Sequence, residues 1–511
     1  MADQQTADWK DLALVIQYFE TIHVREIRAK TPPGGRTSRI RVPVIAIVIT
    51  PPVTGVASIL GLMNSRLDNA AISRTGSGVP PSRGRLLVLT PGMGAVATTF
   101  MAGVEAVRRG TSQPFGSITQ LQTIRIGRRS DQRNPLIRDL VPLAPLEDLC
   151  FAGWDPIPDN AYEAACRAEV LQRSHVDALR DFLSGVAPMA AAFDQHYVKR
   201  LDGPNVKPLR HKRDLAEALR VDVRKALADS GASRAVMIWC GSTEIFLTPA
   251  PCHQSIDAFE AGLSQDDPAI SPSQLYAYAA LKEGVAYANG APNLSADFPA
   301  LEQLALENRV PIAGKDFKTG QTLLKTIIAP GLKARMVGVH GWFSTNLLGN
   351  RDGEVLDDPE SFRAKEVSKS GVLDSILQPS LYPQLYGDLH HRIRINYYPP
   401  RGDSKEGWDN VDIFGWLGYP MQLKINFLCR DSILAAPLVL DLVLLLDLAQ
   451  RAGRSGVQEW LSFFFKSPHV EQGHVAEHDL FIQHFRLKNT LRVLAGEQPL
   501  THLAEDDDSS L

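Results

Sequence analysis

The sequence predicts an α/β protein in which a Rossmann-like domain carries an inserted α+β domain. Apolar runs typical of strands alternate with helical stretches over residues 83–322, as in a parallel sheet with crossover helices. Mixed strands and one helix then occupy 323–437, before a long apolar helix resumes the first pattern. With 511 residues, 44% of them hydrophobic and 22% charged, the chain has room for both domains.

Four parts follow from this pattern. Residues 1–82, rich in Arg, Thr, Pro and Ser, are expected to form an N-terminal extension of uncertain structure. The Rossmann-like domain comprises 83–322 plus 438–503, and the α+β insertion comprises 323–437. Residues 504–511 form an acidic tail.

Charge and cysteine content exclude several classes of partner. The net charge is -3, with 54 basic and 57 acidic residues, so no strong field favours nucleic acid or an anionic membrane. The five cysteines are scattered and never spaced as CxxC, which argues against a disulfide framework and against a zinc site. We therefore expect a cytoplasmic protein that binds no nucleic acid and no membrane, and a site without a metal.

Two segments are apolar enough to be compared with membrane spans. The uncharged stretch between Arg41 and Arg66 is broken by Pro51-Pro52 and Gly55, which favours a strand and a loop over an anchor. The stretch from Ser432 to Ala449 contains a proline and two aspartates, so a helix buried in a protein core is the preferred interpretation.

A glycine turn follows the first strand of the expected sheet. The run RLLVLT (85–90) precedes PGMGAVATTF, which gives the order strand, turn and helix that binds a dinucleotide. The glycines let the backbone turn under a pyrophosphate, and the N–H groups at the helix start bind its oxygens. A GxGxxA match alone is weak, because other tight turns use the same residues. The candidate cofactor-binding residues here are Gly92, Met93, Gly94, Ala95 and Val96.

Further polar side chains lie at the ends of later strands, where an open parallel sheet binds its ligand. These candidates are Asp155, Gly241, Ser242 and Thr243. No acidic residue stands about 20 positions beyond Gly94 to bind the adenosine ribose, and Arg125, Arg128 and Arg129 lie near that region instead. Charge therefore does not decide between NAD and NADP.

The segment GKDFKTGQT (314–322) follows an apolar strand and begins a helix that Thr319 can cap. Free N–H groups at such a helix start bind phosphate, and Lys318 can neutralise it. The segment is not a Walker A loop, and the alternative is an ordinary capped helix with solvated lysines. The candidate phosphate ligands are Lys318, Thr319, Gly320, Gln321 and Thr322.

A second lysine cluster lies on a helix that Asp358 and Pro359 are expected to begin. Lys365 and Lys369 are four positions apart and share one face of this helix. Their mutual repulsion can lower a lysine pKa for general-base catalysis, or both can bind a phosphate or an enolate. Such a pair is usually a solvated face, but this helix follows GNRDG, whose Asn350 and Asp352 are ligand-type residues.

Several ordered blocks resemble one family, the myo-inositol-1-phosphate synthases. The blocks are NGAPN (289–293), KDFKTGQT, STNLLGNRDG, FRAKEVSKS, GDSK (402–405), CRDSILAAPLVLDL and WLSFFFKSP. The resemblance runs from the glycine turn to about Glu497 and is strongest to a bacterial branch, since the turn is shorter than the GWGGNNG form of eukaryotic members. Residues before the turn lie outside it.

The resemblance implies an intramolecular lyase or isomerase that converts D-glucose 6-phosphate to 1D-myo-inositol 3-phosphate with NAD. The steps implied are oxidation at C5, enolisation, intramolecular aldol closure and re-reduction. It also implies a homotetramer, with 323–437 as the catalytic and oligomerisation domain. Two alternatives stay open: an NAD(P)-dependent dehydrogenase of another phosphorylated metabolite, and a non-catalytic NAD-binding regulatory protein.

The same resemblance assigns site residues. Its lysines correspond to Lys365, Lys369, Lys405 and Lys466, and its acidic and amide positions to Asp316, Asn346, Asp352 and Asp431. The first and last of these lysines are expected at the C5 oxygen of the sugar and the other two at the C1 oxygen. Asp316, Asp352 and Asp431 are also expected at the cofactor, and Gly349 and Asn350 at the substrate phosphate.

Overall fold

The protein is described by a computed structural model that covers residues 78–501, and for 366–370 it covers the backbone only. The expectations for the N-terminal extension up to residue 77, for the uncharged segment 41–66 and for the acidic tail lie outside the described residues.

The first sheet is parallel throughout and has the strand order β10-β5-β4-β3-β1-β2. Its strands are β1 (Leu86–Pro91), β2 (Leu149–Trp154), β3 (Arg234–Trp239), β4 (Ala286–Asn289), β5 (Pro311–Ala313) and β10 (Gly456–Val457). Strands β2 and β3 pair with opposite edges of β1, so the chain reverses its direction of winding there. Ligands of doubly wound sheets bind at the carboxyl ends of strands beside such a switch point.

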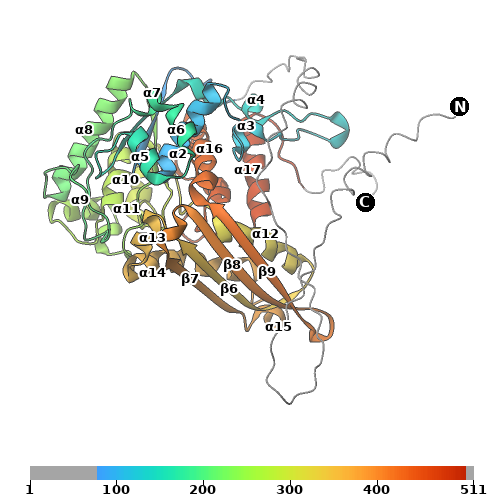
Figure 1. Ribbon diagram of the computed structural model, residues 1–511. Coiled ribbons are helices and arrows are strands. Elements are labelled where there is room, and N and C mark those ends of the chain that lie inside the picture. The colour runs from blue at the N-terminus through green and yellow to red at the C-terminus, as the bar shows by residue number, and fades with distance from the viewer. Residues whose placement is uncertain (1–77, 502–511) are drawn as a thin grey trace. The chain divides into compact units, whose positions relative to one another are not determined.

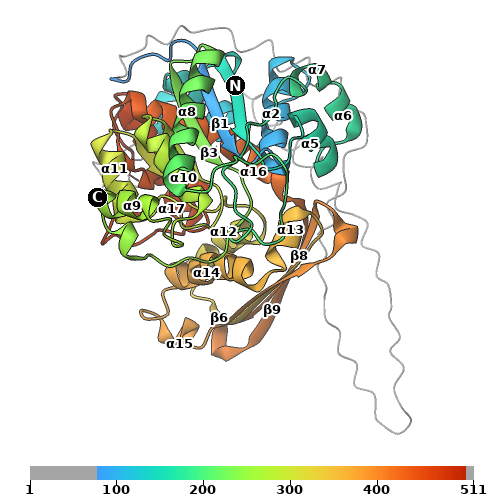
Figure 2. The same ribbon diagram turned by 90° about the vertical axis from the view of Figure 1, so that its left-hand side faces the viewer.

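Helices cover both faces of this sheet, which confirms the α/β class. Helices α8 and α10 lie on one side of β1 and β3, and α2 and α16 lie on the other (Figure 2). The helices of this part are α2 (Ala95–Arg108), α3 (Ile118–Leu121), α4 (Ile137–Leu140), α5 (Ala161–Ala168), α6 (Arg173–Asp177), α7 (Arg180–Leu183), α8 (Lys212–Ser230), α9 (Ile256–Ser264), α10 (Pro272–Lys282), α11 (Pro299–Glu307), α16 (Asp431–Arg451) and α17 (Leu480–Leu494).

Helix α16 is the predicted apolar helix, and the fold buries it. Among the described helices it is the one long and apolar enough to cross a membrane, but 78% of its apolar window is buried inside the protein. Its two buried carboxylates have partners. Asp441 accepts hydrogen bonds from Ser117 and Thr119 hydroxyls, both at 2.6 Å, and from two backbone N–H groups. Asp447 pairs with Arg234 and Arg451 at 3.0 and 2.9 Å, so this helix has the burial of a core helix.

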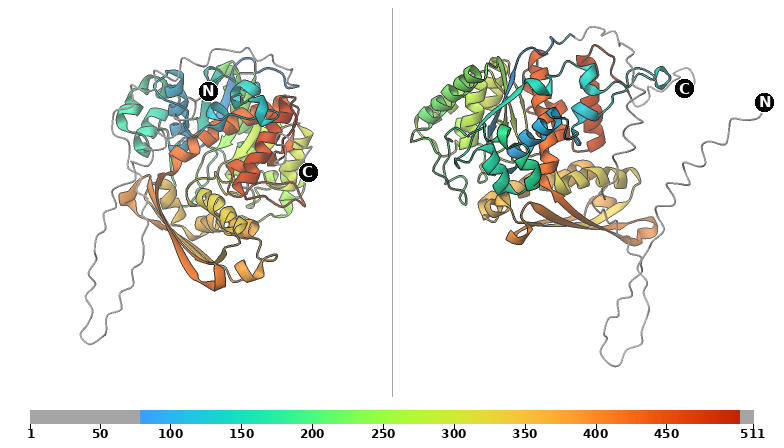
Figure 3. Two further views of the ribbon diagram at one scale, coloured as in Figure 1. Left: turned by 90° about the vertical axis from the view of Figure 1, so that its right-hand side faces the viewer. Right: turned by 45° about the horizontal axis from the view of Figure 1, so that its top comes forward.

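The second sheet has the order β7-β6-β8-β9, with β6 parallel to β7 and the other pairs antiparallel (Figures 1 and 3). Its strands are β6 (Gly338–Leu348), β7 (His390–Tyr397), β8 (Ser404–Phe414) and β9 (Pro420–Arg430). The helices of this part are α12 (Gly320–Ala334), α13 (Arg351–Leu356), α14 (Pro359–Leu377) and α15 (Pro383–Tyr386). Trp342 of β6 and Val411 of β8 pack with Leu373 of α14 in a separate apolar core. One face of the sheet is therefore covered by helices.

Most predicted elements of the insertion form as expected. Helix α14 begins at Pro359, with the Asp358 side chain accepting from the N–H groups of Glu360 and Ser361. Beyond the insertion, the chain forms β10 after α16 and before the next α-helix, α17. Gly453 and Gly456, at φ of +72° and +68°, lead the chain out of the helix into β10, which pairs with β5.

Helices α12 and α16 span the expected domain limits near 322 and 437. The strands of the first sheet come from 86–313 and 456–457, and those of the second from 338–430. The limits of the two domains themselves stay a prediction.

Candidate active site

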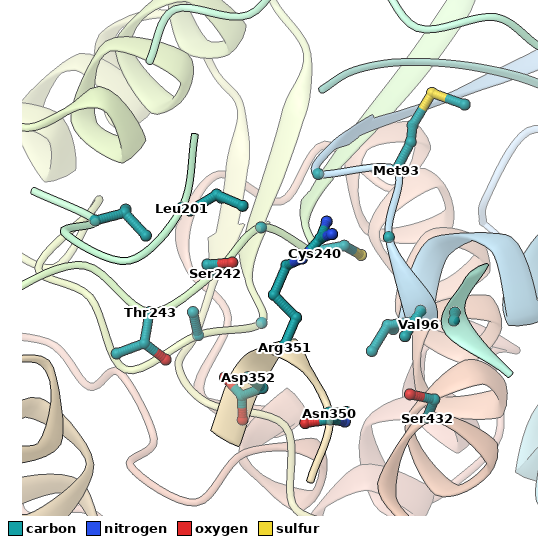
Figure 4. A pocket seen from close by; sticks show the side chains of 18 of the residues that line it. Met93, Val96, Leu201, Cys240, Ser242, Thr243, Asn350, Arg351, Asp352 and Ser432 are labelled. Atoms are coloured by element: carbon teal, nitrogen blue, oxygen red, sulfur yellow. The ribbon is translucent and has the colours of Figure 1, made fainter. Parts of the chain in front are cut away.

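A cavity of about 580 Å³ opens at the carboxyl ends of β1 and β3. The turn after β1, the segment from Trp239 to Glu244 and the segment from Leu348 to Asp352 all line it (Figure 4). The first two segments belong to the parallel sheet and the third leaves the second sheet. The cavity therefore lies at the switch point, between the two sheets.

The glycine turn fits a dinucleotide, and all five of its predicted residues line the cavity. Gly92 has φ of +87°, and a Cβ there would lie 2.3 Å from Cα of Gly241, so only glycine allows the ends of β1 and β3 to approach this closely. Helix α2 starts at Ala95 without a side-chain cap. The N–H groups of its first turn have no intrahelical acceptor, so they are available to bind an anion such as a pyrophosphate.

Asp155 directly follows β2, which is the strand end where the acidic residue of such sheets is expected. The carboxylate ends β2 and accepts hydrogen bonds from the N–H groups of Met93 at 2.8 Å and Ile157 at 2.9 Å. Burial raises the pKa of Asp155, and these two bonds oppose the rise. The expected distance of about 20 positions failed because β2 begins only at Leu149, after a long segment with two short helices. None of Arg125, Arg128 and Arg129 lines the cavity.

The other predicted cofactor residues at strand ends, Gly241, Ser242 and Thr243, line the cavity as well. Together with Asp155 and the glycine turn they form one half of the site. The remaining half is built by lysines and carboxylates.

Asp316 joins two lysines that are far apart in the sequence. Its Oδ1 lies 3.1 Å from Nζ of Lys365 on α14 and 3.3 Å from Nζ of Lys466. The backbone N–H of Lys466 also donates to the carbonyl of Asp316 at 2.6 Å. Asp316 itself has φ of +63°, a left-handed conformation that is rare for a non-glycine residue and costs free energy. The fold therefore holds both ammonium groups at one carboxylate.

The two lysines around Asp316 have pKa values displaced in opposite directions. Burial lowers the pKa of Lys466, and Asp316 only partly opposes this effect. Burial also lowers the pKa of Lys365, but the carboxylates of Asp316 and Asp352 outweigh it and the net pKa is raised. The neutral amine is therefore more accessible for Lys466 than for Lys365, whose ammonium form is favoured.

Lys405 and Asp431 form a second ion pair, with Nζ and Oδ2 separated by 2.6 Å. Burial lowers the pKa of Lys405, but Asp431 outweighs it, so the net pKa is raised. The start of α12 lies beside this pair, since a Cβ on Gly320 would lie 3.1 Å from Oδ1 of Asp431 and 3.5 Å from Nζ of Lys405. Thr319 occupies the N-cap position and lines the cavity, although its side chain makes no cap hydrogen bond.

Other predicted phosphate ligands turn their side chains away from the cavity. The ammonium of Lys318 is bonded to Gln483 of α17, and burial lowers the pKa of Lys318 to about 7. The Gln321 amide donates to Asp409 at 2.8 Å and to two carbonyls of the second sheet. Thr322 is buried and does not line the cavity. Binding of phosphate by these side chains stays a prediction that the geometry does not favour, in contrast to binding by the helix N–H groups.

The remaining predicted residues lie on β6, on the segment after it and on α14. Gly349, Asn350 and Asp352 line the cavity, and Asn350 caps α13 with its side chain. Asn346 is fully buried on β6, with no partner for either amide atom among the described residues. Lys369 lies on α14, but its side chain is outside the described residues.

Several cavity residues were not assigned by the sequence analysis, among them Arg351, Asp403 and Ser432. Asp403 Oδ1 accepts from the Asn350 amide at 2.9 Å, and burial raises the pKa of Asp403 to about 6. Its position inside GDSK, two residues before Lys405, was the available signal. Within residues 78–501 no cluster of three or more His, Cys, Asp or Glu side chains could hold a metal ion.

A dinucleotide cavity at a switch point, continued by paired lysines and carboxylates, defines an NAD-dependent enzyme of the α/β class. More particularly, the chain belongs to the myo-inositol-1-phosphate synthase family, whose model matches residues 86–492 and is described as NAD-binding. This match confirms the predicted family and the predicted cofactor, NAD.

Relatives in several kingdoms support the assignment. The chain is 53% identical to inositol-3-phosphate synthase 1 of Bacteroides thetaiotaomicron over 428 residues, which cover 83% of this chain and 99% of the relative. It is 34% identical to the human inositol-3-phosphate synthase 1, covering 84% and 81% of the two chains. The crystal structure of inositol-3-phosphate synthase from Caenorhabditis elegans superimposes with a TM-score of 0.76 at 28% identity, over 82% of this chain and 87% of that one.

Proposed function

We propose that this protein converts D-glucose 6-phosphate to 1D-myo-inositol 3-phosphate in an NAD-dependent cyclisation with no net redox change. The main support is the convergence of Lys365, Lys466 and Lys405 beside a dinucleotide cavity, with the first two paired to one carboxylate. The bacterial relative that carries this activity in its name spans nearly its whole length in the match.

The shifted pKa values of the lysines indicate a different role for each lysine in the reaction. Bound NAD supplies reversible hydride exchange at C5 of the sugar. Lys466, whose pKa is lowered, accepts the proton of the C5 hydroxyl, and Lys365 remains charged to stabilise the oxygen beside it. Asp316 orients both ammonium groups. Lys405, kept charged by Asp431, stabilises the C1 oxygen as it becomes an alkoxide, and we assign Lys369 to the same oxygen.

The substrate phosphate is bound by the start of α12. The N–H groups of Gly320, Gln321 and Thr322 are in its first turn, where they have no intrahelical acceptor. Thr319 and the segment Gly349–Asn350 line the cavity nearby. Positive charge comes from Lys405 rather than from Lys318, because the latter is bonded to Gln483.

Product identification tests this function directly. Purified protein is incubated with glucose 6-phosphate and NAD, and the phosphate ester is followed by phosphorus NMR while absorbance reports NADH. The cyclase yields an inositol phosphate without accumulating NADH, whereas a dehydrogenase accumulates NADH in proportion to its product. A protein that binds NAD and changes neither signal would be a regulatory protein. Lys365→Ala should abolish cyclisation while leaving NAD bound.

We also propose a homotetramer assembled through the second sheet. The face of this sheet opposite α12 and α14 exposes apolar side chains, with Leu428 of β9 61% exposed and Phe343 of β6 42% exposed. The β8–β9 connection adds Trp416, which is 88% exposed. β9 is also an edge strand with unpaired backbone groups. Covering such a face requires a second copy or another protein.

Leu428→Glu tests the assembly, because it places a charge in the middle of the proposed contact. Mass photometry of the wild-type protein should give a tetramer, and the variant should give smaller species. Val475→Glu is a matched control, since Val475 is exposed but lies far along the chain from this sheet. An unchanged tetramer in Leu428→Glu would exclude this surface.

The protein is further proposed to act in the cytoplasm, without a membrane or nucleic-acid partner. The five cysteines are all unpaired, as a reducing compartment maintains them. Cell fractionation with an antibody against the chain tests this location.

A further inference from the structure

We propose that Arg351 binds the pyrophosphate of NAD from the side of the cavity opposite the glycine turn. The proposal rests on the NAD binding of the family and not on the identity of the sugar substrate. It makes Arg351 a cofactor ligand contributed by the segment that follows the second sheet.

The position of Arg351 supports this role. It is the first residue of α13 and lines the cavity. Figure 4 shows its side chain extending from α13 into the cavity, toward the strand end that carries Cys240 and Ser242. Burial raises the pKa of Asp155, and the charge of Arg351 is one of the effects that oppose this rise. The guanidinium therefore lies within electrostatic range of the end of β2.

The charge balance of the cavity singles out this arginine. Four basic side chains line the cavity: Arg167, Arg351, Lys365 and Lys466. The two lysines are paired with Asp316, and Arg167 is paired with Asp159 at 2.8 Å. Within residues 78–501, Arg351 has no hydrogen bond or ion pair of its own. It is the cavity cation that remains available to an anionic ligand.

The N–H groups of the glycine turn alone do not neutralise the negative charge of a bound pyrophosphate. The N–H of Gly92 donates to the carbonyl of Trp154 at 2.8 Å, and the N–H of Met93 donates to Asp155. Two donors of the turn are thus already used by the protein. A pyrophosphate seated on the start of α2 carries two negative charges that the remaining N–H groups meet only in part. A planar guanidinium can form paired hydrogen bonds to phosphate oxygens, which suits it to this position.

The segment around Arg351 links this contact to the substrate half of the site. The two residues beside Arg351 both belong to this half. Asp352 raises the pKa of Lys365, and the Asn350 amide donates a hydrogen bond to Asp403. An arginine fixed on the cofactor would hold this segment, and with it Asp352, in place. Cofactor binding should therefore also affect the binding of the sugar phosphate.

Binding measurements with Arg351→Gln and Arg351→Lys test the proposal. Isothermal titration calorimetry is performed with NAD, with ADP-ribose, which keeps the pyrophosphate but lacks nicotinamide, and with adenosine, which has no phosphate. Arg351→Gln should weaken the binding of NAD and of ADP-ribose alike, by about 10- to 100-fold. This is the usual loss of affinity when a charge-assisted hydrogen bond is removed. Adenosine should bind unchanged, and Arg351→Lys should recover part of the loss.

Arg167→Gln is the matched control, because Arg167 lines the same cavity but is already paired with Asp159. It should change NAD affinity by less than Arg351→Gln does. Thermal unfolding of each variant checks that the fold is intact, as expected because both arginine side chains are exposed. Undiminished NAD affinity in Arg351→Gln would overturn the proposal. An equal loss for adenosine would overturn it too.

Discussion

Replacement of Asp316 by Asn tests the central electrostatic arrangement of the site. The Asp316 carboxylate lies within 3.3 Å of two buried ammonium groups, those of Lys365 and Lys466. Asn keeps the size of the side chain but removes its charge. Breaking a buried ion pair by removing one partner costs about 3–5 kcal/mol, and a lost transition-state contact reduces kcat about 10²–10³-fold. We expect Asp316→Asn to fold but to be less stable and nearly inactive.

The pH dependence of this destabilisation has a definite sign. Asp316 raises the pKa of both lysines, while burial lowers it from the ordinary 10.5. Without the carboxylate both folded-state pKa values fall below the unfolded value. The folded state then binds fewer protons than the unfolded state between these values, so stability rises with pH in that window. The deficit of Asp316→Asn should be largest at low pH and shrink as pH rises toward 10.5.

Urea unfolding of wild type and Asp316→Asn at about pH 6 and about pH 9 measures this change. Steady-state cyclisation assays on the same samples give kcat. A deficit in the free energy of unfolding that is equal at both pH values would refute the reasoning, because the two ammonium groups would then not depend on Asp316. Full activity in this variant would refute the assignment of its role.

Three further predictions concern other parts of the structure. Lys466→Arg should lower kcat about 10²–10⁴-fold, because a guanidinium cannot accept a proton, and Lys365→Arg should lose less, which pH–rate profiles will compare. Gly92→Ala should destabilise the protein by about 1–3 kcal/mol, because the new Cβ would lie 2.3 Å from Cα of Gly241. The same variant should also bind NAD more weakly, as measured by calorimetry. Asp441→Ala should destabilise by about 3 kcal/mol in urea unfolding without changing NAD affinity, because it leaves buried donors unpaired at a position that does not line the cavity.

The elements around the cofactor were predictable because their signals are local. The run before Gly92 and the turn itself specify a strand, a tight turn and a helix within about twenty residues. Asp358 and Pro359 specify the start of α14 in the same way. Strand β10 gave no such signal, since its two residues form a strand only by pairing with β5. Asp155 was named from its strand, but its relation to the glycine turn required the sheet.

Side-chain direction within the site could not be predicted from spacing. Lys318 and Thr319 are adjacent, yet one is bonded to Gln483 and the other lines the cavity. The N–H of Lys318 donates to the carbonyl of Phe464, which turns this residue toward α17. Arg351 was overlooked for a related reason, since a charged residue at a helix start is usually solvated.

The sequence alone determined the fold class, the cofactor turn and the family, because these depend on residue type and on order along the chain. Tertiary structure alone decided how the pKa values of the two paired lysines differ. Lys365 and Lys466 are about a hundred positions apart, and both are buried at the same carboxylate. Asp316 and Asp352 together outweigh the effect of burial on the pKa of Lys365, whereas burial and the charge of Lys365 keep the pKa of Lys466 low. This difference depends on distances that no spacing in the sequence encodes.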